Sequence, residues 1–344
     1  MFSIPQNAQA QRATASFIFL PDMKSSGRKL LNEIEQATKP YTLASIMGQA
    51  RYVMCDLPFY DLRETAGTNQ GVVHDPAIAG RWFLTDNPVG TDETATASQW
   101  RDLSVCINTI KTVVMTEALI VGRENVFLVG FGIGFAAATA FLMQSEERLG
   151  GLLGVHPVIP FYRDFKYIAM EGQTKAVMNA LWNMPKKDET KTSSEEDEAN
   201  SEASSVTLDG DHGHDCGPVP VQTHEARRAR LMGFFQHLAT QWDAPTDKKY
   251  IDRTDASTPV VLIHGLDDEQ IGFRHAKLAV QAFWELGYKA KLKIMDGEGH
   301  ALTRNLIGEL FNRFMMQNLG NEEVRAQLGG LLSEGIFERW CNES

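Results

Sequence analysis

Residues 125–142 read NVFLVGFGIGFAAATAFL, and the interpretation of the whole chain starts from this stretch. A short apolar run, VFLV, precedes three alternating glycines, Gly130, Gly132 and Gly134, and an Ala-rich apolar segment follows them. Two apolar segments joined by a glycine turn are typical of a buried strand, a tight turn and a buried helix. The stretch therefore predicts a strand–turn–helix unit.

Two known sites have this shape. One is a nucleophile elbow, G-x-S-x-G, in which the turn presents a serine. The other is the glycine turn of a dinucleotide-binding unit, because residues 132–137 fit G-x-G-x-x-A. That second site needs an acidic residue about 20 positions further on, but the next apolar run ends at His156, and Glu146 and Glu147 come too early. We favour the elbow, in which Gly132 takes the position of the nucleophile.

Apolar runs and helical patterns alternate on both sides of this unit. This alternation predicts an α/β protein with a mostly parallel sheet and helices on both faces. Strands are expected at residues 16–20, 51–56, 126–129, 149–159, 259–265 and 290–295, and helices at 28–38, 98–118, 135–143, 225–242, 273–286, 302–318 and 321–340.

Composition limits the kinds of partner. The chain has 344 residues, of which 43% are hydrophobic and 22% charged, as in an ordinary globular protein. Its formal charge is −11, but residues 186–216 alone hold ten acidic residues and three lysines, a net charge of −7. The remainder is only mildly acidic, so we expect no nucleic-acid partner and no anionic membrane partner.

We expect one α/β domain, residues 16–161 and 258–344, after a flexible terminus at residues 1–15. Residues 162–257 are predicted to be an insertion, and its Ser/Glu/Asp-rich part, 186–220, to be disordered. Residues 1–15 are polar, and an uninterrupted apolar run of about 18 residues is lacking, so neither a signal peptide nor a transmembrane segment is predicted. With four scattered cysteines, these features predict a cytoplasmic protein.

Two further motifs follow the elbow in chain order. HGLDD, residues 264–268, comes after one predicted strand, and GEGH, residues 297–300, comes after the next. An acid and then a histidine after late strands is the order Ser…Asp…His of a hydrolase triad. The histidine takes the proton of the attacking hydroxyl, and the carboxylate orients the imidazolium. We predict Asp268 and His300 as this pair, with Asp267 as the competing acid.

On these motifs the chain resembles the phospholipase/carboxylesterase family of α/β-hydrolases, which includes acyl-protein thioesterases. Its members carry H-G-x-G-D-x-G after the first strand, then G-F-S-Q-G, H-G-x-x-D and G-x-x-H; here residues 130–134 read GFGIG. The resemblance covers roughly residues 16–161 and 258–317. It implies an α/β-hydrolase fold and an ancestral hydrolysis of acyl esters or thioesters. It also implies an oxyanion hole built from the backbone amides of Met23 and Ile133.

The departures from the family fall in two catalytic loops. Gly132 replaces the serine, Ile133 the following glutamine, and Pro21-Asp22 the N-terminal His-Gly. Glycine also relieves a backbone strain of about 1–3 kcal/mol at an elbow. We therefore predict a pseudo-hydrolase that keeps Asp268 and His300, has lost its nucleophile, needs no cofactor and binds an acyl or other hydrophobic ligand.

Two other functions stay open. In one, His300 oriented by Asp268 activates water directly, giving an active hydrolase with a non-serine mechanism. In the other, the acidic insert at residues 186–220 recruits a protein partner. His156, at the end of a predicted strand, is either a ligand contact or a buried histidine.

Other reactive side chains are weaker candidates. His212, His214 and Cys216 are zinc- or copper-type ligands, but they lie in the segment predicted to be disordered, and we expect no structural metal site. Cys55, Cys106 and Cys341 do not lie at an elbow; Cys55, at a strand end, is the nearest to a replacement nucleophile.

Overall fold

The computed structural model describes residues 13–23, 25–44, 50–56, 82, 97–145, 148–170, 223–239 and 256–310. The chain divides into two compact units, Met1–Met170 with Thr223–Ser344, and Glu171–Gln222. The second unit falls within the predicted insertion at 162–257, and all of it lies outside the described residues. This unit includes the acidic segment 186–220 and the 212–216 cluster, and the predicted helix 321–340 and Cys341 also lie outside the described residues.

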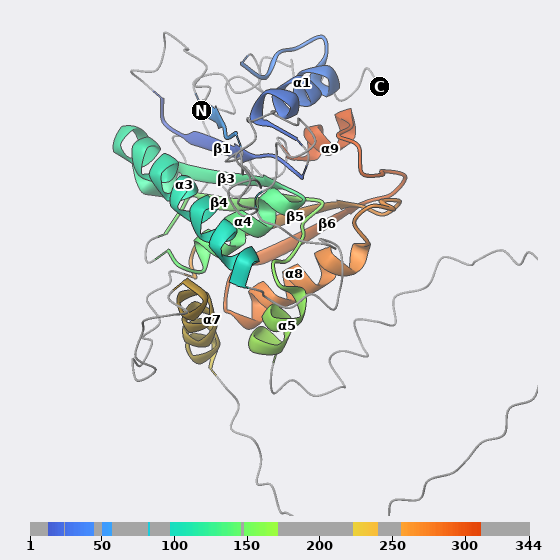
Figure 1. The fold of residues 1–344 in the computed structure, drawn as a ribbon. Helices are drawn as coiled ribbons and strands as arrows, with labels where there is room; N and C mark the ends of the chain where they lie inside the picture. The colour runs from blue at the N-terminus through green and yellow to red at the C-terminus, as the bar shows by residue number, and fades with distance from the viewer. Residues whose placement is uncertain are drawn as a thin grey trace, which may run out of the picture. The chain divides into compact units, whose positions relative to one another are not determined.

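A six-stranded sheet, parallel throughout, forms the centre of the first unit in the order β2-β1-β3-β4-β5-β6 (Figure 1). From β1 the chain moves outward to β2 and then returns past β1 to β3, so the direction of winding reverses between β1 and β3. In open parallel sheets, ligands bind outside the carboxyl ends of the strands at such a reversal. The strands are β1 (Ser16–Leu20), β2 (Arg51–Met54), β3 (Val126–Phe131), β4 (Gly151–Val155), β5 (Val260–Gly265) and β6 (Ala290–Met295).

Helices cover both faces of the sheet, as the alternating pattern predicts. On one face α1 and α9 pack together, and their apolar residues join one core cluster with Phe17, Phe19 and Phe131. On the other lie α3, α4 and α8, with the ring of Phe135 against that of Phe283 (Figure 1). The helices are α1 (Gly27–Thr38), α3 (Ala97–Val121), η2 (Arg123–Asn125), α4 (Ile133–Leu142), α5 (Tyr162–Met170), α7 (His224–Ala239), α8 (Phe273–Glu285) and α9 (Arg304–Glu309).

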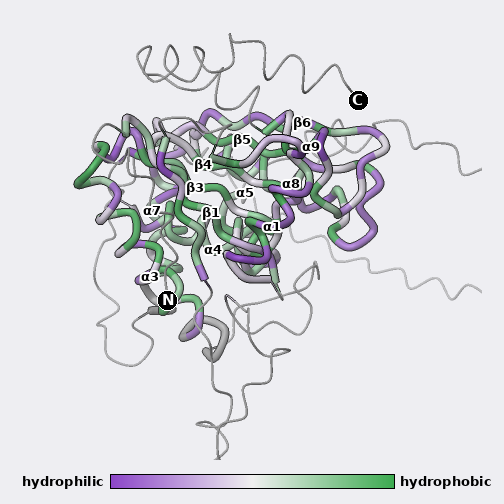
Figure 2. Tube along the Cα trace, turned by 90° about the horizontal axis from the view of Figure 1, so that it is seen from above, coloured by the Kyte–Doolittle hydropathy of each residue, from purple (hydrophilic) through white to green (hydrophobic). Residues whose placement is uncertain are grey.

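Burial follows the hydrophobic pattern of the sequence. All residues of β1, β3, β4 and β5 are buried, and so is every residue of α4. Figure 2 shows hydrophobic colour running through β1 and β3, with hydrophilic segments toward the periphery. A strand buried on both faces reads as a continuous apolar run, which is why these strands were recognisable in the sequence. The predicted α/β class with a mostly parallel sheet is confirmed.

The sequence predicts no transmembrane segment, but part of helix α3 meets the length and composition criteria for one. Its part Asp102–Val121 is long and apolar enough to cross a membrane by length and composition, with a mean hydropathy of 1.5. The search for an unbroken apolar run missed it because Lys111 and Glu117 interrupt the run. In the structure α3 packs on α4, β1 and β3. Core helices of globular proteins satisfy the same criterion, so α3 is weak evidence for a membrane span.

A partly buried ion pair connects α3 to the sheet. The carboxylate of Glu117, which is 2% exposed, accepts hydrogen bonds from Ser16 Oγ at 2.6 Å and from Arg51 Nε at 2.7 Å. Ser16 begins β1 and Arg51 begins β2. The one acidic residue that breaks the apolar pattern of the helix near its end therefore holds two strand starts together.

Candidate active site

The loops that follow five parallel strands meet at one edge of the sheet. Asp22, Gly132, His156, Asp268 and His300 come after β1, β3, β4, β5 and β6 respectively. Because the carboxyl ends of parallel strands share an edge, residues far apart in sequence gather there. The structure thus brings the predicted Gly132, Asp268 and His300 together.

The turn after β3 has the shape of an elbow. Gly132 has φ 50° and ψ −116°, a conformation that favours glycine, and α4 begins at the next residue. A Cβ at Gly130 would lie 2.3 Å from Phe135 Cα, and one at Gly134 would lie 2.2 Å from Leu20 O. Both glycines are therefore required by the close approach of backbone to backbone, so the glycine pattern reflects the sharpness of the turn.

The Asp22 carboxylate occupies the predicted oxyanion hole. Asp22 Oδ1 accepts hydrogen bonds from the backbone amides of Met23 at 2.7 Å and Ile133 at 2.8 Å. These are the two amides that the family resemblance implied as oxyanion donors, and they converge on one oxygen. Sequence reasoning treated Pro21-Asp22 only as a departure from the family and missed this role. The available signal was an acid two positions after a strand that ends at the site.

The same carboxylate fills the space above Gly132. A Cβ built on Gly132 would lie 2.1 Å from Asp22 Oδ1 and 2.2 Å from Asp22 Cγ. Such distances are far inside van der Waals contact, so a serine does not fit at this position while Asp22 keeps its place. A side chain from the first loop thus stands where the elbow side chain would project.

His300 lies between two carboxylates. Its Nε2 is 3.3 Å from Asp22 Oδ2, and its Nδ1 is 3.0 Å from Asp268 Oδ2. Hydrogen bonds to Asp22, and then to Asp268, raise the pKa of His300 to about 9, although partial burial opposes the shift. His300 is therefore an imidazolium at neutral pH.

Asp268 is the acid that faces His300. Its Oδ1 accepts hydrogen bonds from the backbone amides of Gln270 and Ile271, both at 2.9 Å. Asp268 is 6% exposed, whereas the competing Asp267 is exposed. Burial alone would raise the pKa of Asp268, but hydrogen bonds with His156 and His300, and the Ile271 amide, together hold that pKa well below its usual range. Asp268 is thus ionised, and its orientation is fixed by the backbone.

The loops that carry this pair are locked to each other. The amide of Asp267 donates to Glu298 O at 3.0 Å, and a Cβ on Gly265 would lie 2.3 Å from the same oxygen. The Glu298 carboxylate accepts from Thr303 Oγ1 at 2.5 Å and Asn305 Nδ2 at 2.8 Å. The glycine in HGLDD and the glutamate in GEGH therefore position the loop that presents His300.

Two buried histidines lie behind the pair. His156, with φ 50°, is 2% exposed, and its Nδ1 is 2.8 Å from Asp268 Oδ2; its ring also borders the cavity described below. Burial, with the neighbouring His156, lowers the pKa of His264 to about 4. One ligand atom each from His156, His264 and Asp268 lies within 4.8 Å of the others, as in a metal site. Asp268 Oδ1 is held by two backbone amides, and its Oδ2 also faces His300.

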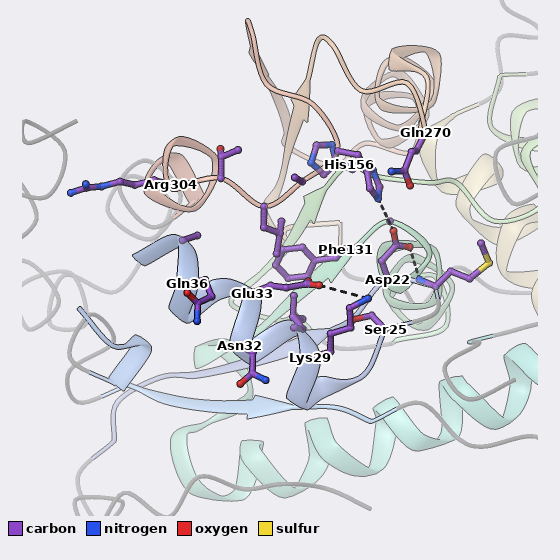
Figure 3. Close-up of a pocket in the computed structure, with 18 of the residues that line it drawn as sticks. Asp22, Ser25, Lys29, Asn32, Glu33, Gln36, Phe131, His156, Gln270 and Arg304 are labelled. Carbon is purple, nitrogen blue, oxygen red and sulfur yellow. Dashed lines mark hydrogen bonds and ion pairs between the residues drawn. The ribbon is translucent and has the colours of Figure 1, made fainter. Parts of the chain in front are cut away.

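A cavity of about 1040 Å³ opens over Asp22 and Gly132 (Figure 3). Its walls come from the loop after β1, from α1, from the carboxyl ends of β3 and β4, and from the loop between β6 and α9 with the start of α9. Apolar groups and charged groups both contribute: Met23, Leu30, Phe131, Ala301 and Leu302 on the one hand, and Lys29, Glu33 and Arg304 on the other. The side chain of Asp22, 25% exposed, borders the cavity.

Neither of the two described cysteines borders the cavity. Cys55 is fully buried after β2, and burial raises its pKa to about 12. Cys106 is also buried, and its Sγ donates to Trp82 O at 2.5 Å. Cys55 therefore stays a thiol at neutral pH, which leaves it a poor replacement nucleophile.

The strand order, the elbow after β3 and the loops after β5 and β6 define an α/β-hydrolase fold. No family model and no curated protein matches the chain. Among solved structures it is similar to Arabidopsis thaliana SOBER1, with 14% identity over 92% of this chain and 99% of that chain and a TM-score of 0.48.

The chain is also similar to two further solved structures. Zea mays acyl-protein thioesterase 2 shares 13% identity over 93% of this chain and 98% of that one, with a TM-score of 0.48. A carboxylesterase from Mesorhizobium loti shares 10% identity over 94% and 91%, with a TM-score of 0.45.

Proposed function

We propose that this protein is a pseudo-hydrolase, impaired in the hydrolysis of acyl esters and thioesters, which uses its cavity to bind a ligand. The observation that carries the proposal is the Asp22 carboxylate on the amides of Met23 and Ile133. Acyl transfer requires those donors for the oxyanion of the tetrahedral intermediate. The negatively charged Asp22 oxygen already accepts hydrogen bonds from both amides, and it repels the negatively charged oxygen of an intermediate.

The other two requirements of serine-type catalysis fail in the same place. Gly132 offers no hydroxyl to form an acyl-enzyme. His300, held between Asp22 and Asp268, carries a proton at neutral pH and therefore cannot accept one. Two of the three defects involve Asp22, so the proposal does not depend on the glycine alone.

The ligand we propose is a small molecule with an apolar part, such as an acyl chain. Phe131, Leu30 and Leu302 supply an apolar wall within the cavity. Lys29 and Arg304 also border it and would suit a polar or anionic end of the same molecule. As predicted from the sequence, the proposed function needs no cofactor.

The direct test is hydrolysis of p-nitrophenyl butyrate and of a palmitoyl thioester by the purified full chain. We expect no turnover above that of the His300→Ala variant, since the site cannot form or stabilise an acyl intermediate. Turnover of either substrate that His300→Ala abolishes would overturn the proposal. Binding of a fluorescent fatty acid, displaced by non-fluorescent palmitate, measures the retained pocket.

A further inference from the structure

The Asp22 carboxylate is more than an obstruction. Its Oδ1 is held by two amides, while its Oδ2 lies 3.3 Å from His300 Nε2 and its side chain borders the cavity. It occupies the space of the absent elbow side chain. One oxygen is thus anchored where an oxyanion would form, and the other is placed beside the histidine, where a nucleophile belongs.

Carboxylates serve as nucleophiles in covalent catalysis, and the choice of electrophile follows from chemistry. Attack on an acyl carbon would yield a mixed anhydride and would need the oxyanion hole that Asp22 itself fills. Attack on a saturated carbon yields an ordinary ester. In that ester Asp22 Oδ1 becomes the carbonyl oxygen, already on the amides of Met23 and Ile133. Those amides then stabilise the oxyanion when water attacks Cγ.

We propose that Asp22 is the nucleophile of an epoxide-opening reaction in this cavity, and that His300 activates the water that hydrolyses the resulting ester. This reaction is independent of the proposed loss of acyl hydrolysis, because it uses no serine and no vacant oxyanion hole. Asp22 and His300 are its catalytic residues, and Asp268 orients the histidine.

The bonds and protons balance over two steps. Asp22 Oδ2 forms a bond to an epoxide carbon, the ring C–O bond breaks, and the alkoxide takes a proton that His300 gives up through solvent. Water then attacks Cγ while neutral His300 accepts its proton. The bond from Cγ to the alkyl oxygen breaks, the leaving alkoxide takes the second proton of the water from the newly formed carboxylic acid, and the diol leaves. Asp22 returns as a carboxylate and His300 as an imidazolium, so the sum is epoxide plus water giving a diol.

The charges explain why an epoxide suits the site. Opening the ring consumes one proton, and the resting imidazolium between Asp22 and Asp268 has one to give. Esterification then removes the charge of Asp22, whose hydrogen bond is the largest cause of the raised pKa of His300. The histidine thereby becomes a base only after the ester has formed, which is the moment at which a base is needed.

The test uses the full chain with styrene oxide as the probe. The His300→Gln variant lacks the base for the second step, so we expect it to accumulate one probe molecule per chain as an ester on Asp22, located by peptide mass spectrometry. The wild type should release the diol and accumulate little ester. The Asp22→Asn variant should neither form the ester nor produce diol.

A second readout does not depend on a variant folding. In a single turnover of the wild type in ¹⁸O-water, hydrolysis at Cγ puts the label into the Asp22 carboxylate, whereas direct attack of water on the epoxide puts it into the diol. Absence of both the adduct and the label overturns the proposal, as does equal esterification of the exposed Asp267 and Glu269. Ester hydrolysis by the same preparations would overturn only the proposed loss of acyl hydrolysis.

Discussion

At the residue scale, Asp22 and Gly132 depend on each other. A Cβ at Gly132 would lie 2.1 Å from Asp22 Oδ1, so a serine at the elbow and a carboxylate in the oxyanion hole exclude one another. The missing nucleophile and the changed first loop are therefore one structural change.

This relation predicts how esterase chemistry can be restored. Gly132→Ser alone should stay inactive and lower the free energy of unfolding by about 1–3 kcal/mol, because the new side chain meets Asp22 and strains the backbone. Asp22→Gly with Gly132→Ser should recover stability and gain hydrolysis of p-nitrophenyl butyrate that depends on His300. Urea unfolding and the ester assay check both halves. A double variant that folds but shows no His300-dependent activity would contradict the coupling.

The imidazolium of His300 predicts a pH dependence of stability. Its folded pKa, about 9, exceeds the ordinary value of 6.5, so its contribution is complete below pH 6.5 and is lost as the pH rises through about 9. At pH 7 this contribution is on the order of 2 kcal/mol. Urea midpoints between pH 6 and pH 10 should fall for the wild type and change less for His300→Gln. Parallel curves for the two would show that His300 is not held between carboxylates.

At the element scale, the strands and the elbow turn could be predicted from the sequence because they depend on local sequence patterns. The apolar runs located all six strands, and β6 has the predicted bounds, Ala290–Met295. The strand predicted at residues 149–159 is longer than the observed β4, Gly151–Val155. The chain leaves the sheet at His156, which has φ 50° and is followed by a proline. The elbow geometry also followed from its glycines.

The position of the Asp22 side chain could not be predicted in this way. Asp22 and Ile133 are 111 residues apart, and their hydrogen bond exists only because β1 and β3 are neighbours in the sheet. Likewise, the motif order suggested Asp268 and His300, but their 3.0 Å approach depends on loops that Glu298 fixes. A local sequence pattern predicts a helix or a strand, whereas the contacts between loops depend on the tertiary arrangement.

Helix α3 gives a prediction at this scale. Replacing Glu117 by alanine leaves Arg51 and Ser16 without their shared acceptor at the start of two strands. Because loss of the shared carboxylate leaves Ser16 Oγ and the partly buried guanidinium without their acceptor, we expect a loss of about 1–3 kcal/mol in the free energy of unfolding. Lys111→Ala, at an exposed position of the same helix, is the matched control and should change little. Equal effects of the two substitutions in urea unfolding would rule out a structural role for the pair.

At the scale of the whole molecule, the reversal of strand order between β1 and β3 determines where the site lies. The loop after β1 and the elbow after β3 flank that reversal, and these two loops hold the altered chemistry. The remaining loops supply the acid and the histidine. The fold therefore places the loop that carries Asp22 beside the elbow that carries Gly132.

The division into two compact units predicts that the first folds without the second. A chain in which a flexible Gly/Ser linker replaces Glu171–Gln222 should unfold cooperatively and keep the raised pKa of His300. Differential scanning calorimetry should show a melting temperature within a few degrees of the full chain, since changing loop length costs only about 0.6 kcal/mol per doubling. An aggregated or non-cooperative product would mean that the second unit is part of the folding core.

The central claim is that Asp22 has taken the place of the elbow nucleophile and faces His300. The titration of the His300 ring, followed by ¹⁵N and ¹H NMR in the wild type and in Asp22→Asn, tests it most directly. We predict a pKa of about 9 in the wild type and a clear decrease in the variant, because the hydrogen bond to Asp22 is the largest cause of the shift. A pKa near the ordinary 6.5 in the wild type, or one that Asp22→Asn leaves unchanged, would contradict the claim.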